Sequence, residues 1–330
     1  MTINKEFLER DTNIKAKIIC DSIHEGKRIT TFELEYHRFI HAELLTHRMF
    51  SRNCSSSRAI PLKRMLETTE NNLAIPIYYG ANKQGMQATE EIEQVSKAKK
   101  LWHDAFKSAS SYAVKLGELG LHKQIPNRLV EPFQIIKVVV TSTDFENFFN
   151  LRIHKDAQPE ILVLANKMYE AYVASEPLEL NLDEYHLPYI ERERLEDGSL
   201  SYYTVDVDTS DSETNGYEYK SVLNAEDAVT LSVASCAAVS YRTESMTFEK
   251  AVKIFDMLLK ADVAHGSPLE HIAKPMRDQT SLSKWDEGTT HIDKWGNYFS
   301  GNLKGWIQFR QLIEGHVCNE FDYEGRMKSF

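Results

Sequence analysis

Residues 134–142 read QIIKVVVTS, a short run rich in β-branched side chains that predicts a buried strand. Residues 30–36, TTFELEY, alternate apolar and polar side chains and predict a half-buried strand. Apolar side chains at three- and four-residue steps predict helices over 38–49 and 88–118. A further helix begins near Pro159, because proline suits the first helical position. Strands that alternate with helices in this way predict a mixed α+β (α/β) fold.

Two capping boxes predict further helix starts. Thr143 and Glu146 have the S/T-x-x-E form directly after the buried strand, and Ser267 and Glu270 have it within SPLEH, where Pro268 takes the first helical position. The hydroxyl and the carboxylate of such a box accept hydrogen bonds from backbone N–H groups of the first turn. We therefore expect a helix after Thr143 and a helical turn after Ser267.

The second half of the chain differs in composition. Residues 176–222 are acidic and rich in turn formers, with short strand-like pieces such as SYYTVDV, and predict an irregular connector. Residues 225–240 and 247–261 have helical patterns. We therefore divide the chain into a core unit at 1–175, the connector, and a helical unit at 223–330 that completes the core.

Composition excludes several classes of protein. The chain has 330 residues and a formal net charge of −10, which argues against binding of a nucleic acid polymer, since such binding relies on clustered cations. It contains neither a membrane-length apolar stretch nor a signal peptide, so we expect a soluble, cytoplasmic protein without a membrane partner. No metal site is indicated, and the cysteines form no C-x-x-C pair, so we expect reduced thiols at Cys20, Cys54, Cys236 and Cys318.

Residues 46–58, THRMFSRNCSSSR, are the most informative segment for function. Three arginines and four serines can present guanidinium groups and hydroxyls to a phosphate, although a solvated polar turn has the same composition. The segment resembles the signature RHRxxSxNxxSxR of flavin-dependent thymidylate synthases. Thr46 stands where the family has its first arginine. The positions that match in register are His47, Arg48, Ser51, Asn53, Ser56 and Arg58.

Two further segments carry the same resemblance. Residues 147–161, NFFNLRIHKDAQPEI, are similar to the family's NFLxLRxxxxAQxEI, which implies that Arg152 is the catalytic arginine and that Asn147 contacts the flavin. Residues 265–271, HGSPLEH, resemble the family's HxSPLEH, whose last histidine, here His271, lies beside the flavin. The stretch SVASCAAVSY before it is similar to the family's AARVCY helix.

The order of these segments is unusual. In the family the AARVCY and SPLEH elements precede the arginine signature, whereas here they follow it. One hypothesis is a circular permutation, which is tolerated where native termini lie close together at the surface. The hypothesis requires the turn after Ser267 to lie near residues 46–58.

The resemblance implies a fold with a central, mainly antiparallel sheet and long helices, and a homotetramer with active sites shared between subunits. It implies reductive methylation of dUMP to dTMP, with methylenetetrahydrofolate as the carbon donor and with FAD, reduced by NADPH, as the hydride source. The cofactor-binding candidates are Thr46, His47, Arg48, Asn147, Ser267 and His271. The substrate-binding candidates are Glu43, Ser56, Ser57, Arg58, Lys123 and Arg128, the last two because HKQIPNR occupies the place of a phosphate-binding ARxxLP segment.

Two other functions remain open from the sequence. One is a pyrimidine hydroxymethylase or an enzyme acting on dCMP, because a carboxylate at Glu43, where the family commonly has glutamine, can accept from an amino group. The other is a non-catalytic nucleotide-binding descendant, for which Thr46 and the altered HKQIPNR segment are signs of decay. Rossmann and P-loop motifs are absent from the chain, so neither dinucleotide fold is supported.

Overall fold

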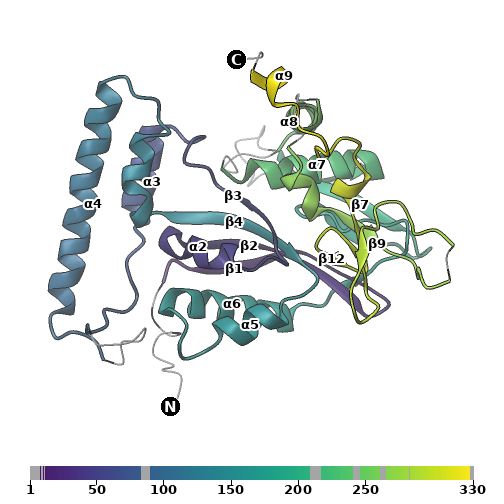
Figure 1. Ribbon diagram of the computed structural model, residues 1–330, viewed down its shortest axis with the longest axis horizontal. Helices are drawn as coiled ribbons and strands as arrows, with labels where there is room; N and C mark the ends of the chain where they lie inside the picture. Colours follow the sequence, from purple (N-terminus) through teal and green to yellow (C-terminus); the bar gives the residue numbers. More distant parts are fainter. Residues whose placement is uncertain are drawn as a thin grey trace.

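The computed structural model describes residues 8, 10, 12–82, 90–208, 217–240, 246–260, 265–281 and 283–327. The first residues of the helix predicted from 88, the last residue of the one predicted to 261, Tyr241 of the AARVCY-like stretch and most of DTSDSETNG lie outside this part. The predicted fold class is confirmed: helices surround a mainly antiparallel sheet (Figure 1). None of the described helices is long and apolar enough to span a membrane.

The central sheet has the strand order β3-β4-β2-β1-β5. Every pair in it is antiparallel except the short parallel pair of β1 and β5. The turn between β1 and β2 is built by Glu25 and Gly26, which both have positive φ, as a tight hairpin turn requires. The strands are β1 (Lys15–His24), β2 (Lys27–His37), β3 (Ser51–Cys54), β4 (Ile135–Ser142) and β5 (Leu178–Glu179).

The strands predicted at 30–36 and 134–142 are confirmed as β2 and β4, and they pair with each other. The helix predicted at 38–49 is only partly correct. It consists of the 3-10 helix η1 (Arg38–Ile40) and the short α2 (His41–Leu45), after which the chain turns back as β3. The backbone of residues 51–54 pairs with the edge of β4, and no local sequence pattern predicts a pairing between such distant segments.

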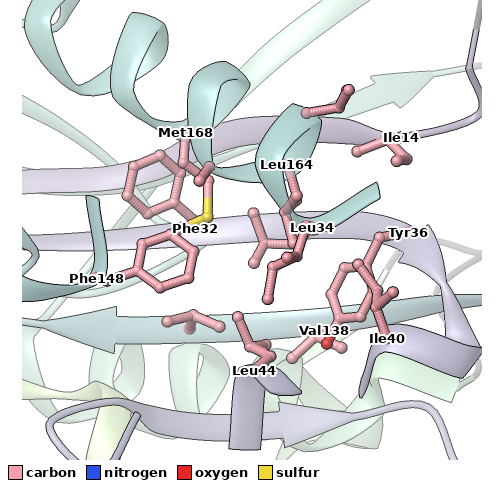
Figure 2. Packing of buried hydrophobic residues seen from close by; sticks show 14 of the residues in the cluster. Ile14, Phe32, Leu34, Tyr36, Ile40, Leu44, Val138, Phe148, Leu164 and Met168 are labelled. Atoms are coloured by element: carbon pink, nitrogen blue, oxygen red, sulfur yellow. The ribbon is translucent and has the colours of Figure 1, made fainter. Parts of the chain in front are cut away.

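One face of the sheet holds the main apolar core. Phe32 and Leu34 of β2 and Val138 of β4 point to this face, where Leu164 and Met168 cover them (Figure 2). The covering helices are α5 (Glu146–Arg152) and α6 (Pro159–Ala174), which begins at its proline as the sequence predicts. Side chains at alternate positions of a strand share one face, so a second row of β4 points the other way.

The opposite face is covered by the C-terminal part of the chain. Val139 of β4 belongs to a second apolar cluster that includes Leu231 and Leu269. Figure 1 shows α7 and α8 on this side of the sheet and α5 and α6 on the other. The covering elements are α7 (Ala225–Ala237), η3 (Ala238–Ser240), α8 (Phe248–Leu259) and η4 (Ser267–His271). Strand β4 is therefore buried on both faces.

A third group of helices lies to the side of the sheet (Figure 1). The 24-residue α4 (Val95–Glu118) confirms most of the helix predicted at 88–118, and Gly120 follows its end with a positive φ of 83°. Phe106 of α4 packs with Val130 in a small apolar cluster. This group consists of α4, α3 (Leu62–Asn71) and η2 (Pro126–Phe133).

The segment 176–222 is more regular than the irregular connector expected from its composition. After β5 it forms a three-stranded antiparallel sheet, in which the strand-like SYYTVDV is part of β7. Its strands are β6 (Glu191–Arg194), β7 (Leu200–Asp208) and β8 (Tyr217–Leu223). The remaining elements are β9 (Ala273–Pro275), β10 (His291–Ile292), β11 (Tyr298–Ser300), β12 (Leu303–Lys304), β13 (Trp306–Gln308), η5 (Phe309–Leu312) and α9 (Tyr323–Met327).

Both predicted capping boxes are wrong, because distant partners take their side chains. The Thr143 hydroxyl accepts from the backbone N–H of Lys304 at 2.9 Å, and α5 begins only at Glu146 without a side-chain cap. Glu270 pairs with Arg310, and Gly266 occupies the N-cap position of η4. Both turns form as predicted, but tertiary contacts hold them.

A buried chain of hydrogen bonds joins the second face of the sheet to its cover. The imidazole of His186 bonds to the hydroxyls of Ser22 and Thr31, each at 2.8 Å. Thr31 bonds to Thr141 at 2.7 Å, and Thr141 bonds to His271 Nδ1 at 2.8 Å. All five side chains are buried. Burial, reinforced by the charge of a nearby arginine, lowers the pKa of His186 well below its usual value, so its imidazole is neutral.

Replacing Thr141 with Val tests this chain of hydrogen bonds. Valine keeps the shape but removes the hydroxyl between Thr31 and His271, so we expect the free energy of unfolding to fall by about 1–3 kcal/mol. Chemical denaturation measures it. Thr68→Val, at an exposed helical position whose hydroxyl bonds to the carbonyl of Arg64, is the control and should change stability by less than about 0.5 kcal/mol. Equal stability of both variants would contradict this account of the interface.

Candidate functional site

Helix α5 brings Arg152 to the start of the 46–58 segment. Phe148 and Phe149 of this helix are buried in the main core, which fixes the helix against the sheet. Arg152, at its last position, donates through Nη1 to Glu43 Oε2 at 2.8 Å and through Nε to His47 Nε2 at 3.0 Å. Its Nη2 lies 3.3 Å from the Thr46 hydroxyl. The guanidinium is therefore held by three residues of α2 and the loop after it.

This geometry determines the protonation of His47. Because Arg152 donates to Nε2, that nitrogen carries a lone pair and the proton of the neutral ring lies on Nδ1. The ring stacks on Phe50 and meets Phe148 edge to face, with ring centres 5.7 Å and 4.9 Å away. Burial lowers the pKa of His47 to about 4, and the guanidinium groups of Arg152 and Arg52 contribute. His47 is therefore a neutral side chain at physiological pH.

A cavity of about 340 Å³ opens beside Arg152, and we call it the arginine cavity. It brings together side chains about a hundred positions apart in the sequence, from the 46–50 loop and from the start and end of α5. Predicted site residues that line it are Thr46, His47, Arg48, Asn147 and Arg152, together with Met49, Phe50, Asp144, Phe148 and Leu151. Cations, an amide and aromatic rings in one cavity suit an anionic aromatic ligand.

A second cavity of about 280 Å³, which we call the serine cavity, lies at the other end of the 46–58 segment. The predicted residues Ser56 and Ser57 line it. Three cations that the sequence analysis did not single out, Arg38, Arg64 and Lys137, line it as well. Its other lining residues are Glu35, Ser55, Ile60, Met65, Thr68, Thr69, Asn72, Gln134, Ile135 and Val239. Two signals were available in the sequence: Arg38 directly follows β2, and Lys137 interrupts the apolar run of β4.

The signature thus divides between two cavities, because β3 separates its ends. Ser51 pairs with Thr141 and Cys54 pairs with Val138, so the middle of the segment is an extended edge strand. At roughly 3.4 Å per residue, β3 alone separates the two ends of the segment by on the order of 10 Å. The predicted flavin and substrate residues of one chain therefore do not meet at one point.

Four predicted substrate-binding residues have other surroundings. Lys123 donates to the backbone carbonyl of Ala59 at 2.8 Å, so its ammonium group holds the 55–60 loop. Arg128 is exposed and lies 3.5 Å from Glu131. Glu43 binds Arg152. Arg58 is exposed, and it is not among the side chains that line either cavity. The structure brings none of these four into the cavities.

The SPLEH element also differs from expectation. His271 is fully buried in the hydrogen-bond chain with Thr141, so its side chain is enclosed between the sheet and its cover. Ser267 is exposed and caps nothing. The element nevertheless lies against the signature segment, because η4 contacts β3. Asn53 of β3 also donates to the carbonyl of Cys236 in the adjoining α7 at 3.1 Å. The proximity that the permutation hypothesis requires is therefore present, and the permutation remains a hypothesis.

A mixed α+β fold with two polar cavities along one signature segment defines a candidate ligand-binding protein. In the comparison with known proteins, residues 26–178 match the family described as thymidylate synthase complementing protein. The matching segment contains β2 to α6 and every lining residue of the two cavities except Val239. No curated protein is close enough in sequence to count as a match.

Solved structures are similar to part of the chain. The UMP/dUMP methylase PolB from Streptomyces cacaoi, bound with 5-Br UMP, has 14% identity and a TM-score of 0.42, and the match covers 51% of this chain and 91% of that one. The flavin dependent thymidylate synthase ThyX from Helicobacter pylori, complexed with FAD and dUMP, has 18% identity and a TM-score of 0.32. That match covers 44% of this chain and 67% of the other.

Charge changes around His47 test the contacts of Arg152. Arg152→Gln is expected to raise the pKa of His47 from about 4, because it removes a cation that lowers it. Glu43→Gln is expected to lower that pKa further, because Arg152 loses its neutralising carboxylate. NMR titration of the ring measures both shifts, with Lys253→Gln on α8 as the control. The same pKa in all variants would show that Arg152 does not act on the ring.

Proposed function

We propose that the protein is a flavin-dependent thymidylate synthase: it methylates dUMP reductively to dTMP, with methylenetetrahydrofolate as the carbon donor. The observation that carries the proposal is the arginine cavity. Arg152 and Asn147, from the second family-like segment, line it together with Thr46, His47 and Arg48 from the first. The match of residues 26–178 to the family of thymidylate synthase complementing proteins supports the same conclusion.

The residues of the arginine cavity fit part of a flavin dinucleotide. Arg48 is exposed at the cavity and offers a permanent cation to a phosphate, and Asn147 offers an amide. A volume of about 340 Å³ is near the lower limit for small-molecule sites, so it can hold one portion of FAD but not the whole cofactor. When bound, FAD reduced by NADPH supplies the hydride.

Arg152 is the group we assign to stabilise charge on the pyrimidine ring. Its guanidinium stays protonated, and Glu43, Thr46 and His47 hold it in place before the substrate arrives. A donor that is oriented in advance stabilises charge that develops in the transition state without first having to reorganise. The neutral His47 accepts from Nε, and Glu43 and Thr46 accept from the Nη groups, so a ligand would take a remaining N–H of Nη1 or displace one of these partners.

The serine cavity is the candidate for the nucleotide. Its serine hydroxyls and the cations Arg38, Arg64 and Lys137 can bind a phosphate, and its apolar side chains can pack on a base. Carboxylates pair with two of these cations: Arg38 bonds to Glu131 at 2.9 Å, and Lys137 lies 3.3 Å from Glu35. A nucleotide phosphate would therefore compete with existing ion pairs for its site.

A homotetramer with shared active sites would unite the two cavities. The residues around Arg152 and those around Ser56 lie at opposite ends of β3 in one chain. In a symmetric assembly the serine cavity of one subunit can face the arginine cavity of another, because each interface repeats the same contacts. The proposed chemistry needs flavin, folate and nucleotide to stack within one site.

The catalytic prediction concerns Arg152→Ala. Protein reconstituted with FAD is reduced anaerobically and incubated with methylenetetrahydrofolate and either dUMP or dCMP, and the products are identified by mass. We expect dTMP from dUMP, with a rate about 10²- to 10³-fold lower in Arg152→Ala. Arg277→Ala, at an exposed ion pair with Asp286, is the control.

The other outcomes of this assay identify the alternatives. A hydroxymethylated product would identify a hydroxymethylase, and a product from dCMP alone would identify a cytosine enzyme. Absence of turnover with both nucleotides would overturn the proposal and favour a non-catalytic nucleotide-binding protein.

Shared sites can be tested by mixing two inactive variants. Arg152→Ala disables one cavity, and Ser56→Trp fills the other. After subunits exchange, we expect the mixture to recover activity that neither variant has alone, because some sites combine two intact cavities. Failure of the mixture to recover activity, with subunit exchange verified by mass, would contradict sharing.

A further inference from the structure

The turn between β11 and β12 reaches from the C-terminal unit to the arginine cavity. Ser300 and Leu303 pair across it, so Gly301 and Asn302 form a two-residue turn. Gly301 has a positive φ of 59°, and a Cβ there would lie 2.7 Å from Gln308 Oε1. Glycine is therefore required by both conformation and packing. Figure 1 shows β12 beside the end of the central strands.

Asn302 holds the loop that carries His47 and Arg48. Its Nδ2 donates to the carbonyl of Met49 at 2.9 Å and lies 3.1 Å from the Ser51 hydroxyl. Its Oδ1 accepts from Gln308 Nε2 at 2.8 Å, which fixes the orientation of the amide. The Met49 carbonyl accepts a second bond, from the Ser142 hydroxyl at 3.1 Å. The backbone carbonyl of Met49 is thus held by one side chain of the turn and by one side chain of β4.

The same turn also holds the opposite wall of the cavity. The backbone N–H of Lys304 donates to the Thr143 hydroxyl at 2.9 Å, and its ammonium group lies 4.0 Å from Asp144 Oδ2. Asp144 lines the arginine cavity, and α5 with Asn147 and Arg152 begins just after it. Asn302 and Lys304 therefore contact two wall segments that are about a hundred positions apart in the sequence.

We propose that Asn302 is a positioning residue of the arginine cavity, which fixes the distance between the 46–50 loop and α5 through the carbonyl of Met49. In its functional consequence this inference rests on the proposed function, because the cavity is then the flavin and catalytic-arginine half of the active site. Asn302 lies outside residues 26–178, which match the family, whereas every residue that lines the arginine cavity lies within them. The proposal therefore gives the C-terminal part of the chain a role in that cavity. Such positioning matters because small displacements of catalytic groups reduce rates severely.

The test uses the full chain without flavin and two variants. Asn302→Ala removes the whole amide, and Asn302→Asp keeps the acceptor for Gln308 but loses the donor to Met49, so it serves if the alanine variant fails to fold. The control is Asn297→Ala, an asparagine of the neighbouring turn that bonds only to Asp293 among the contacts the structure describes. NMR titration of His47 and amide hydrogen exchange at residues 47–50 are the measurements.

We expect both Asn302 variants to raise the pKa of His47 from about 4 toward 6.5, because a displaced loop exposes the ring, and to speed exchange of those amides. Asn297→Ala should leave both readouts unchanged. If FAD binds the wild type, its dissociation constant should rise about 3- to 10-fold in Asn302→Ala, as expected for one lost hydrogen bond. A change confined to the thermal midpoint, with the titration and exchange of the wild type, would overturn the proposal. A wild type that binds no FAD would instead overturn the proposed function and leave the first two readouts valid.

Discussion

Burial of β4 on both faces is the constraint on which the rest of the structure depends. A strand in this position needs two covers, and the chain supplies them from two segments that both follow it in the sequence. Helices α5 and α6, which directly follow β4, cover the row that contains Val138. The row that contains Val139 is covered by α7 and η4, which lie more than 80 positions later in the sequence. The continuous β-branched run in the sequence reflects this double burial.

The two faces of β4 are joined to their covers by different physical interactions. The first interface is apolar, whereas the second combines apolar contacts with the hydrogen-bond chain through His186. One set of proton positions satisfies this chain in a single direction, from Arg192 through Ser22, His186, Thr31 and Thr141 to His271. Each hydroxyl in it both accepts and donates. Such a chain fixes the register of the cover on the sheet, which apolar contacts alone specify less sharply.

The parts of the fold that the sequence predicted are those whose signal is local and long. The strands at 30–36 and 134–142 and the helix of α4 carry their own periodicity, and their positions are confirmed. The wrong predictions share one cause. The capping boxes at Thr143 and Ser267 are correct as local patterns, but Lys304 and Arg310 bind the side chains on which they depend. Strand β3 was missed because it forms by pairing with an edge that lies about 85 positions later in the chain.

The candidate site was predictable to the extent that one segment carries its residues. Arg152 and His47 could be predicted because both of their segments carry family-like patterns. The structure places them in contact at 3.0 Å, although they are 105 positions apart in the sequence. Lys123 was a weaker prediction, since a cation in a loop serves a carbonyl as readily as a phosphate, and here it binds Ala59. The cations of the serine cavity were missed because Arg38 and Lys137 lie outside every segment that carries a family-like pattern.

The division of the signature between two cavities follows from its secondary structure. A helix would have placed residues seven or eight positions apart on one face, about two turns from each other. The segment instead becomes the edge strand β3, which sends Arg48 and Ser56 in opposite directions along the sheet. An edge strand cannot bend its two ends together while it stays paired with β4. A single chain therefore does not bring both ends of the signature to one point, and the shared sites of the proposed function would meet this constraint by adding a second copy.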